Sequence, residues 1–279
     1  MKVMIVGHTS MIGEALVAGL RGRGECLTAG RRHADVPFDA TGDALPDVPG
    51  ACEAAVLCAA SFGGDDESGI LANARVNALG SLRAAMLAAR AGCGHVVYLS
   101  SLSSIAHPEN GAQGSYGLSK RQGQENVALY CAARGIPCTA LLLSQVYDAA
   151  GKARRHQPML YRLLDCARAG QEVVLHGRRD PLRNYLYLDD VVDIVRRVLE
   201  RRVAGVFPCV HPRSHRLSEV ARAAFRTFGQ PERIRWLPDR PDIATLFIPQ
   251  DLGLYARLEY TPETDLEAGM AGIRKAGAA

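Results

Sequence analysis

The sequence predicts an α/β fold, a doubly wound parallel sheet with a smaller C-terminal substrate-binding lobe. Three observations predict it. Short apolar, β-branched segments alternate with helical segments through the first half of the chain, a glycine-containing turn joins the first strand to the first helix, and prolines become frequent in the last third. A chain of 279 residues with 48% hydrophobic composition can bury such a sheet on both faces.

The expected elements follow one another in the order that a doubly wound sheet requires. We expect strands at 3–6, 26–29, 54–58, 95–99, 139–143 and 205–210, each a short apolar run. Helices are expected at about 14–23, 70–90, 116–134 and 189–202, where apolar residues recur with helical spacing. Glycines at 22 and 24 end the first helix. This alternation predicts parallel strands joined by helical crossovers.

The pattern loosens beyond Tyr147, where glycine, arginine and proline punctuate the chain. We therefore assign residues 1–150 together with 185–210 to a nucleotide-binding domain, and residues 151–184 together with 211–279 to the substrate-binding lobe. The sequence contains no internal repeat and no low-complexity linker.

Charge and composition exclude several classes of partner. The 33 basic and 29 acidic residues give a formal charge of +4 without a long basic run, so no nucleic-acid partner is expected. The eight cysteines are spread singly without metal-ligand spacing, which indicates buried thiols in a reduced compartment and no metal site. No stretch approaches the roughly 20 apolar residues of a spanning helix, so we expect a cytoplasmic protein that does not bind membranes.

The turn after the first strand is the candidate cofactor site. Gly7-His8-Thr9-Ser10-Met11-Ile12-Gly13 lies where backbone N–H groups and a helix dipole bind phosphate. Ser10 stands where a middle glycine is usual, and its hydroxyl is a candidate phosphate ligand. This position, in the first βα turn of a Rossmann sheet, predicts dinucleotide binding by Gly7, Thr9, Ser10, Met11, Ile12 and Gly13.

The second strand ends in Gly30-Arg31-Arg32 and offers no carboxylate for a ribose 2′-hydroxyl. Arginines at this place suit a 2′-phosphate, although arginines that simply face solvent would look the same in the sequence. We therefore predict that Arg31 and Arg32 bind the cofactor and that NADP(H) is favoured over NAD(H).

Tyr116 and Lys120 form the candidate catalytic pair. They lie four residues apart in an expected helix, which places them on one face about 5–6 Å apart at Cβ. A free tyrosine has a pKa of about 10, and a nearby cation lowers it. Such a pair can move a proton to or from an alcohol. The same spacing also arises by chance on solvated helices. A catalytic interpretation therefore depends on the glycine turn and the sheet pattern in the rest of the sequence.

Together these motifs resemble the extended branch of the short-chain dehydrogenase/reductase superfamily, the nucleotide-sugar epimerases and dehydratases. The resemblance covers nearly the whole chain. Phe38-Asp39-Ala40 is similar to the adenine-contacting turn, Cys58-Ala59-Ala60 to the segment beside the cofactor, and Asn77 to the asparagine of the following helix. The stretch from Arg183 to Val191 is similar to the Arg-Asp-(Phe/Tyr)-x-(Tyr/His)-Val-x-Asp segment of that branch. The cofactor contacts that the resemblance implies include Asp39, Ala40, Ala59, Ala60, Asn77, Tyr116 and Lys120.

The resemblance also implies roles. Tyr116 is the general acid/base, and Lys120 binds the nicotinamide ribose and lowers the tyrosine pKa. The serine that bonds the reacting oxygen can be registered in two ways: the simpler members of the superfamily select Ser101, whereas the sugar epimerases place Leu102 there and leave Ser103 as a substitute. We choose Ser101 as the catalytic serine and Ser103 as a substrate contact. A homodimer through the two long helices is implied as well.

Several positions depart from the family pattern. The 4,6-dehydratases carry an Asp-Glu pair where this chain has serines and Leu102, which disfavours dehydration. Gln145 replaces an asparagine that often contacts the substrate diphosphate, and we keep it as a substrate contact. Arg183 is expected to pair bidentately with a diphosphate, the alternative being an ion pair with Asp180 or Asp189.

The predicted function is hydride transfer at a carbonyl or hydroxyl carbon of a nucleotide-activated sugar. Net reduction and redox-neutral epimerisation both stay open. The arginines after the second strand favour net reduction, whereas the Arg183 segment favours epimerisation. Two alternatives remain: a reductase of a non-sugar carbonyl, which the unusual Leu142-Leu143 segment leaves open, and a non-catalytic NADP(H) sensor, which the retained Tyr116 and Lys120 disfavour. His8 and His107 are weaker acid/base candidates, because loop histidines are usually solvated or packed.

Overall fold

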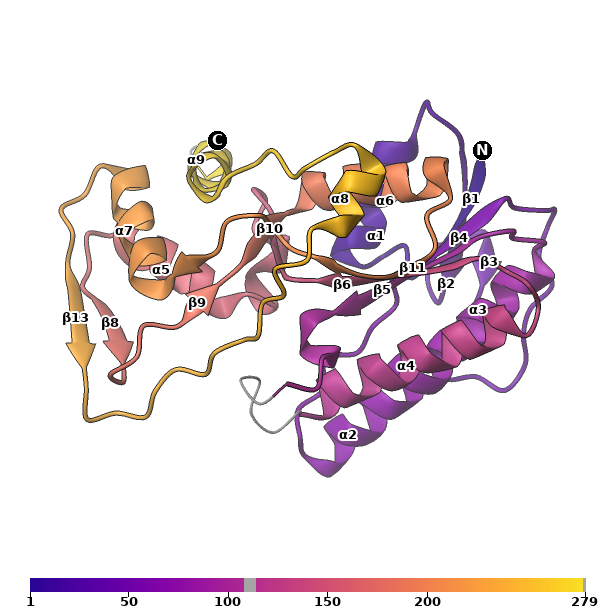
Figure 1. Ribbon diagram of the computed structural model, residues 1–279, viewed down its shortest axis with the longest axis horizontal. Helices are drawn as coiled ribbons and strands as arrows, with labels where there is room; N and C mark the ends of the chain where they lie inside the picture. Colours follow the sequence, from indigo (N-terminus) through magenta and orange to yellow (C-terminus); the bar gives the residue numbers. More distant parts are fainter. Residues whose placement is uncertain (108–113, 278–279) are drawn as a thin grey trace.

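The computed structural model describes residues 1–107 and 114–277. A seven-stranded parallel sheet lies at the centre of the molecule, with the strand order β11-β6-β5-β4-β1-β2-β3 (Figure 1). Its strands are β1 (Lys2–Val6), β2 (Glu25–Gly30), β3 (Val36–Pro37), β4 (Ala54–Leu57), β5 (Val96–Ser101), β6 (Cys138–Leu143) and β11 (Gly205–Cys209). The order reverses between β1 and β4, the switch point at which doubly wound sheets bind their ligands. The predicted fold class is confirmed.

Helices cover both faces of this sheet (Figure 1). One face carries α1 (Met11–Leu20), α6 (Leu188–Arg201) and α8 (Gly253–Leu258). The other carries α2 (Glu67–Asn73), the π-helical turn η1 (Ala74–Leu79), α3 (Gly80–Arg90) and α4 (Ser115–Ala132). The sequence predicted one helix over 70–90, whereas η1 divides it. Single π-helical turns are rare and concentrate at functional sites.

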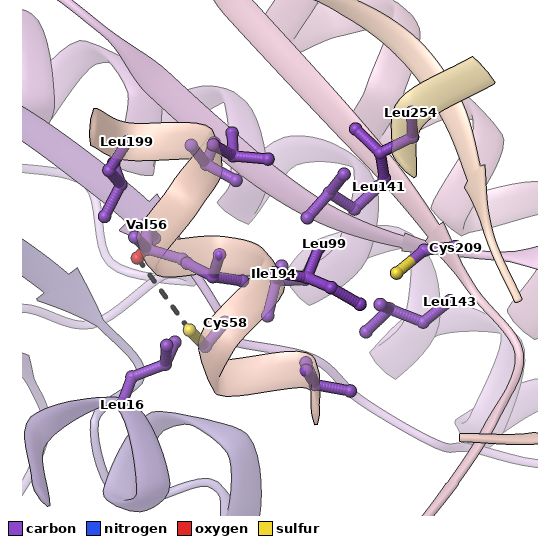
Figure 2. Close-up of a cluster of buried hydrophobic side chains, with 14 of the residues drawn as sticks. Leu16, Val56, Cys58, Leu99, Leu141, Leu143, Ile194, Leu199, Cys209 and Leu254 are labelled. Carbon is purple, nitrogen blue, oxygen red and sulfur yellow. Dashed lines mark hydrogen bonds between the residues drawn. The ribbon is translucent and has the colours of Figure 1, made fainter. Parts of the chain in front are cut away.

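Two hydrophobic clusters pack these helices onto the sheet. Successive side chains of β1 point to opposite faces of the sheet and so belong to different clusters. Ile5 lies in the first cluster, under α1 and α6, and Met4 lies in the second, under α3 and α4. Figure 2 shows the first cluster, in which Ile194 of α6 meets Leu99 and Leu141 of the sheet. Leu254 of α8 joins the same cluster, so α8 packs on the central sheet although it falls within the range 211–279 assigned to the lobe.

The smaller lobe has a core of its own. It contains α5 (Pro158–Arg168), α7 (Leu217–Phe228) and α9 (Leu266–Ala276), with β8 (Val173–His176) paired to β13 (Ile234–Leu237). Two small pairings, β7 (Gln145–Tyr147) with β10 (Tyr185–Tyr187) and β9 (Leu182–Arg183) with β12 (His215–Arg216), link it to the sheet. Residues 278 and 279 of the predicted lobe lie outside the described residues, and the domain boundaries stay a prediction.

An extended segment returns from β13 to α8 along the molecule (Figure 1). Leu246 and Ile248 of this segment pack against the second cluster, and the Ala244 carbonyl accepts a hydrogen bond from Arg183. The segment therefore contacts both the lobe and the sheet. Across the described residues, no helix is long and apolar enough to cross a membrane.

Candidate active site

The turn between β1 and α1 lies against the residues that follow β4. Gly7 has a φ of +84°, and a Cβ there would lie 2.6 Å from the Ala59 backbone nitrogen. A Cβ at Gly13 would collide with the Gly7 carbonyl oxygen. Ser10 caps α1, because its Oγ accepts the Gly13 N–H at 3.1 Å. Glycine is thus required at both ends of the turn, and the Ser10 oxygen predicted to meet phosphate also serves as a helix cap.

The other predicted cofactor residues surround this turn. Thr9 is exposed at its tip, whereas Met11 and Ile12 pack against the first cluster. Ala40 lies below η1 and α3, where a Cβ at Gly80 would come within 2.8 Å of the Ala40 Cβ. Ala59 therefore borders the glycine turn, whereas Ala40 borders the start of α3.

The end of β2 carries the residues predicted to select the cofactor. Arg31 and Arg32 are exposed. The pKa of Asp39 is lowered chiefly by the hydrogen bonds that its carboxylate accepts from the Thr41 N–H and hydroxyl, and to a smaller extent by the charges of Arg31 and Arg83. Arg31 and Asp39 are thus brought together at this edge of the sheet.

The ring of His8 also lies at this edge of the sheet, a position that no sequence pattern indicates. A Cβ at Gly30 would come within 3.2 Å of His8 Nδ1, so glycine at the end of β2 makes room for the imidazole. Nδ1 is buried and lacks a hydrogen-bond partner among the described residues. A buried polar atom without a partner is costly, and it marks a place where a polar ligand would be stabilised.

α4 presents Tyr116 and Lys120 to the end of β5. Lys120 is only 2% exposed, donates from Nζ to the Leu99 carbonyl oxygen at 2.5 Å and lies 4.3 Å from the centroid of the Tyr98 ring. Burial lowers the Lys120 pKa. Burial raises the Tyr116 pKa, while the charge of Lys120 and a hydrogen bond with Ser101 oppose that shift. The predicted pair and Ser101 therefore share one site.

The serine-rich segment after β5 forms a short 3-10 turn, η2 (Leu102–Ser104). Ser101 Oγ accepts the Ser103 N–H at 3.2 Å, and Ser104 Oγ donates to the Ser101 carbonyl at 2.7 Å. Leu102 is fully buried in the second cluster. The turn thus directs Ser101 towards Tyr116 and Leu102 into the core.

Asn77 lies within η1 and is fully buried. Its amide accepts from the Ser61 N–H at 2.8 Å, and donates to the Ser61 carbonyl at 2.9 Å and to Ser119 Oγ at 3.0 Å. The side chain that the sequence predicted to contact the cofactor is therefore used to hold the segment after β4 against α4.

The predicted substrate contacts lie at the junction with the lobe. Gln145 Nε2 donates to Gln157 Oε1 at 2.9 Å, while Gln145 Oε1 is buried without a partner among the described residues. Arg183 is 8% exposed and donates to the carbonyls of Leu182 and Ala244, both at 2.8 Å. In the described part of the chain no carboxylate lies within ion-pair distance of Arg183, so the alternative ion pair is not observed.

Two aromatic residues near Tyr116 gave no signal in the sequence. The Phe62 ring stacks on Tyr116 with centroids 4.7 Å apart, and His156 of the lobe lies 4.2 Å from Phe62. Neither belongs to a recognisable motif, and each contact joins residues distant in the chain.

Residues 3–208 match the sequence model of the NAD dependent epimerase/dehydratase family. The chain belongs to this family. The match spans nearly all of the central sheet and includes the candidate catalytic residues, which confirms the resemblance drawn from the motifs. A search of curated proteins finds no significant match.

Solved structures share the fold over the full chain. MoeE5 in complex with UDP-glucose and NAD is 21% identical, with a TM-score of 0.81 and coverage of 100% of this chain and 99% of that one. UDP-N-acetylglucosamine 4-epimerase from Bacillus cereus is 17% identical, with a TM-score of 0.79 and coverage of 99% and 96%. UDP-glucose 4-epimerase from Thermus thermophilus, complexed with NAD, is 18% identical, with a TM-score of 0.76 and coverage of 99% and 98%.

Proposed function

We propose that this protein transfers hydride at a hydroxyl-bearing carbon of a nucleotide-activated sugar, with Tyr116 as general acid/base, and that the net reaction is epimerisation. The observation that carries the proposal is the buried Lys120 beside Tyr116, with Ser101 close enough to the same phenol to lower its pKa. Several similar structures are UDP-sugar 4-epimerases, which supports epimerisation over net reduction. The serines and Leu102 after β5 offer no carboxylate pair for the elimination of water.

The residues at the switch point fit a dinucleotide. Glycine at position 7 lets the turn lie directly against the Ala59 backbone, and the first N–H groups of α1, which follow this turn, have no carbonyl partner within the helix and suit a phosphate. The unpartnered His8 Nδ1 at the end of β2 offers a further polar contact. A nicotinamide bound here would supply a reversible hydride acceptor for the sugar carbon.

The protein's own residues handle the proton. Tyr116 takes the hydroxyl proton as the sugar is oxidised and returns it as the keto sugar is reduced. Lys120 keeps the phenol acidic enough for this by its charge, and Ser101 donates to the reacting oxygen. Because Lys120 is buried, its charge acts on Tyr116 with little screening by water.

The junction with the lobe fits the polar part of the substrate. Gln145 and Tyr185 are directly paired in the register of β7 and β10. Gln145 Oε1 and the Tyr185 hydroxyl are both buried without partners among the described residues, and such groups are stabilised when a ligand bonds to them. Arg183 lies two residues before Tyr185. To bind the diphosphate, its guanidinium would give up its hydrogen bonds to the carbonyls of Leu182 and Ala244 and donate to phosphate oxygens instead.

Replacing Tyr116 with phenylalanine removes the acid/base group and keeps the ring. We expect Tyr116→Phe to lower kcat by about 10²–10⁴-fold with UDP-glucose or UDP-N-acetylglucosamine, and to change the Kd of NADH by less than about twofold. Tyr130→Phe, at the far end of the same helix, is the matched control and should leave kcat unchanged. A Tyr116→Phe enzyme that turns over at the wild-type rate would reject the proposed role.

We further propose that the cofactor is NADP(H). The two solved complexes named above contain NAD, so this preference rests on the exposed Arg31 and Arg32, which directly follow β2, and on the nearby His8. The arginines would pair with the 2′-phosphate by charge-assisted hydrogen bonds.

Fluorescence titration with NADPH and NADH tests this preference. The wild type should bind NADPH about tenfold more tightly, and Arg31→Ala should abolish the difference, because a hydrogen bond to a charged group contributes about 1.5–3 kcal/mol. Arg235→Ala is the control, since Arg235 pairs with Glu172 in the lobe at 2.8 Å. Tighter binding of NADH by the wild type would contradict the proposal.

We also propose a homodimer through α2, η1 and α4. Leu71 and Leu79 are 54% and 58% exposed, and Leu118 and Leu129 of α4 are 39% and 73% exposed. Eleven residues separate the last two, about three helical turns, so they lie on one face. Light scattering should give twice the 30.0 kDa chain mass, and Leu129→Asp should give the monomer. A wild-type protein of monomer mass at micromolar concentration would refute the dimer.

A further inference from the structure

The Phe62 ring bridges the sheet domain and the lobe at the catalytic tyrosine. It stacks on Tyr116 with centroids 4.7 Å apart and planes 19° apart, and its other neighbour is His156, with centroids 4.2 Å apart and planes 38° apart. Tyr116 lies on α4, Phe62 follows β4, and His156 follows the 3-10 turn η4 (Lys152–Arg155). The ring thus contacts an aromatic side chain from each part of the molecule, yet it remains 52% exposed.

Two buried asparagines hold the backbone on either side of Phe62. Asn77 accepts the Ser61 N–H at 2.8 Å and donates to the Ser61 carbonyl at 2.9 Å. Asn73 does the same for Gly63, at 2.8 and 3.0 Å. Both asparagines are fully buried. Because each amide must present its oxygen to an N–H and its nitrogen to a carbonyl, this clasp fixes both amide orientations.

The spacing of the clasp suits the two elements that it joins. Asn73 and Asn77 are one helical turn apart, a rise of about 6 Å. Ser61 and Gly63 are two residues apart in extended chain, about 6.6 Å. Each asparagine also donates to a serine of α4, Asn73 to Ser115 at 2.8 Å and Asn77 to Ser119 at 3.0 Å. The clasp therefore fixes Phe62 relative to Tyr116, which lies between these two serines.

The same segment is anchored at the start of α4. Asp65 Oδ1 accepts the Ser115 N–H at 2.7 Å, and Ser115 Oγ donates to the Gly64 carbonyl at 3.0 Å. Burial of a half-exposed ring does not explain why so many hydrogen bonds hold the backbone around it. The arrangement instead holds an aromatic ring beside a reacting hydroxyl.

We propose that Phe62, together with His156, sets the size of the sugar substituent that reaches Tyr116, and that Asn73 is a positioning residue for Phe62. The proposal rests on the proposed function. The ring occupies the space between α4 and the lobe, so a sugar group bulkier than a hydroxyl, such as an N-acetyl group, must displace it. Selectivity of this kind arises by exclusion of the larger substrate.

Calorimetric titration of the full chain, loaded with its nicotinamide cofactor, tests the selectivity with UDP, UDP-glucose and UDP-N-acetylglucosamine. Phe62→Ala should raise the affinity for UDP-N-acetylglucosamine relative to UDP-glucose by about tenfold, because space for a few heavy atoms is opened. The affinity for UDP should change less than about twofold. Phe62→Tyr keeps the ring and should keep the wild-type ratio, and Leu252→Ala, an exposed apolar residue elsewhere, should do so too.

Asn73→Ala tests the positioning role. This substitution should shift the ratio of the affinities for UDP-N-acetylglucosamine and UDP-glucose in the same direction as Phe62→Ala. It leaves the side chains of Tyr116 and Lys120 in place, and the affinity for the cofactor should equal that of the wild type. Asn126→Ala is the matched control, because Asn126 joins the same helices by a bond to the Ala78 carbonyl at 3.4 Å and does not touch the clasp. An Asn73→Ala ratio equal to that of Asn126→Ala would refute the positioning role.

A ligand-free measurement separates this inference from the proposed function. Stacking on Phe62 shifts the His156 ring protons upfield in the NMR spectrum, and Phe62→Ala and Asn73→Ala should move them downfield. His156→Gln assigns the signals. If these signals do not move, or if UDP-glucose binds and Phe62→Ala leaves the ratio unchanged, the inference is overturned while the proposed function stands. If the wild type binds none of the three UDP compounds, the proposed function fails, and the inference with it.

Discussion

The buried ammonium group of Lys120 is the constraint on which the rest of the site depends. A charge removed from water is costly unless polar groups surround it. Here the Leu99 carbonyl at the end of β5, the face of the Tyr98 ring and the phenol of Tyr116 do so. The Tyr98 hydroxyl donates to the Lys120 carbonyl at 3.3 Å, which ties the helix backbone to the same strand. α4 must therefore lie close to the end of β5, and this brings Tyr116 to Ser101.

Close packing on the other side of α4 follows from the same requirement. A Cβ at Gly123 would collide with the Asn77 carbonyl and lie 2.7 Å from the Tyr98 hydroxyl, so glycine lets α4 settle between η1 and the sheet. The π-helical turn then directs the Asn77 amide to both α4 and the segment after β4. Because that segment also borders Gly7, the glycine turn, the Tyr116/Lys120 pair and Phe62 are parts of one packed unit.

Much of this arrangement could be predicted from the sequence, because it depends on local patterns. The alternating strands, the glycine turn and the Tyr116/Lys120 spacing predicted the sheet and the switch point. The two-residue strand β3 has no periodicity to detect, and the π-helical turn has no signature within a run of good helix formers. The bond that ties Asn73 to α4 could not be predicted, because its partner Ser115 is 42 residues away. The position of His8 could not be predicted either, because it depends on Gly30 of another strand. The side-chain bonds of Arg183 and Gln145 likewise depend on the lobe.

In this arrangement the charge of Lys120 is expected to control the ionisation of Tyr116. NMR titration of protein labelled with ¹³C at the tyrosine Cζ measures this without any substrate, and Tyr116→Phe assigns the signal. Since burial raises the Tyr116 pKa and Lys120 opposes that rise, Lys120→Met should move the Tyr116 titration to higher pH. Circular dichroism over the same pH range confirms that the fold is kept. A Tyr116 signal that titrates at the same or a lower pH in Lys120→Met would contradict the account.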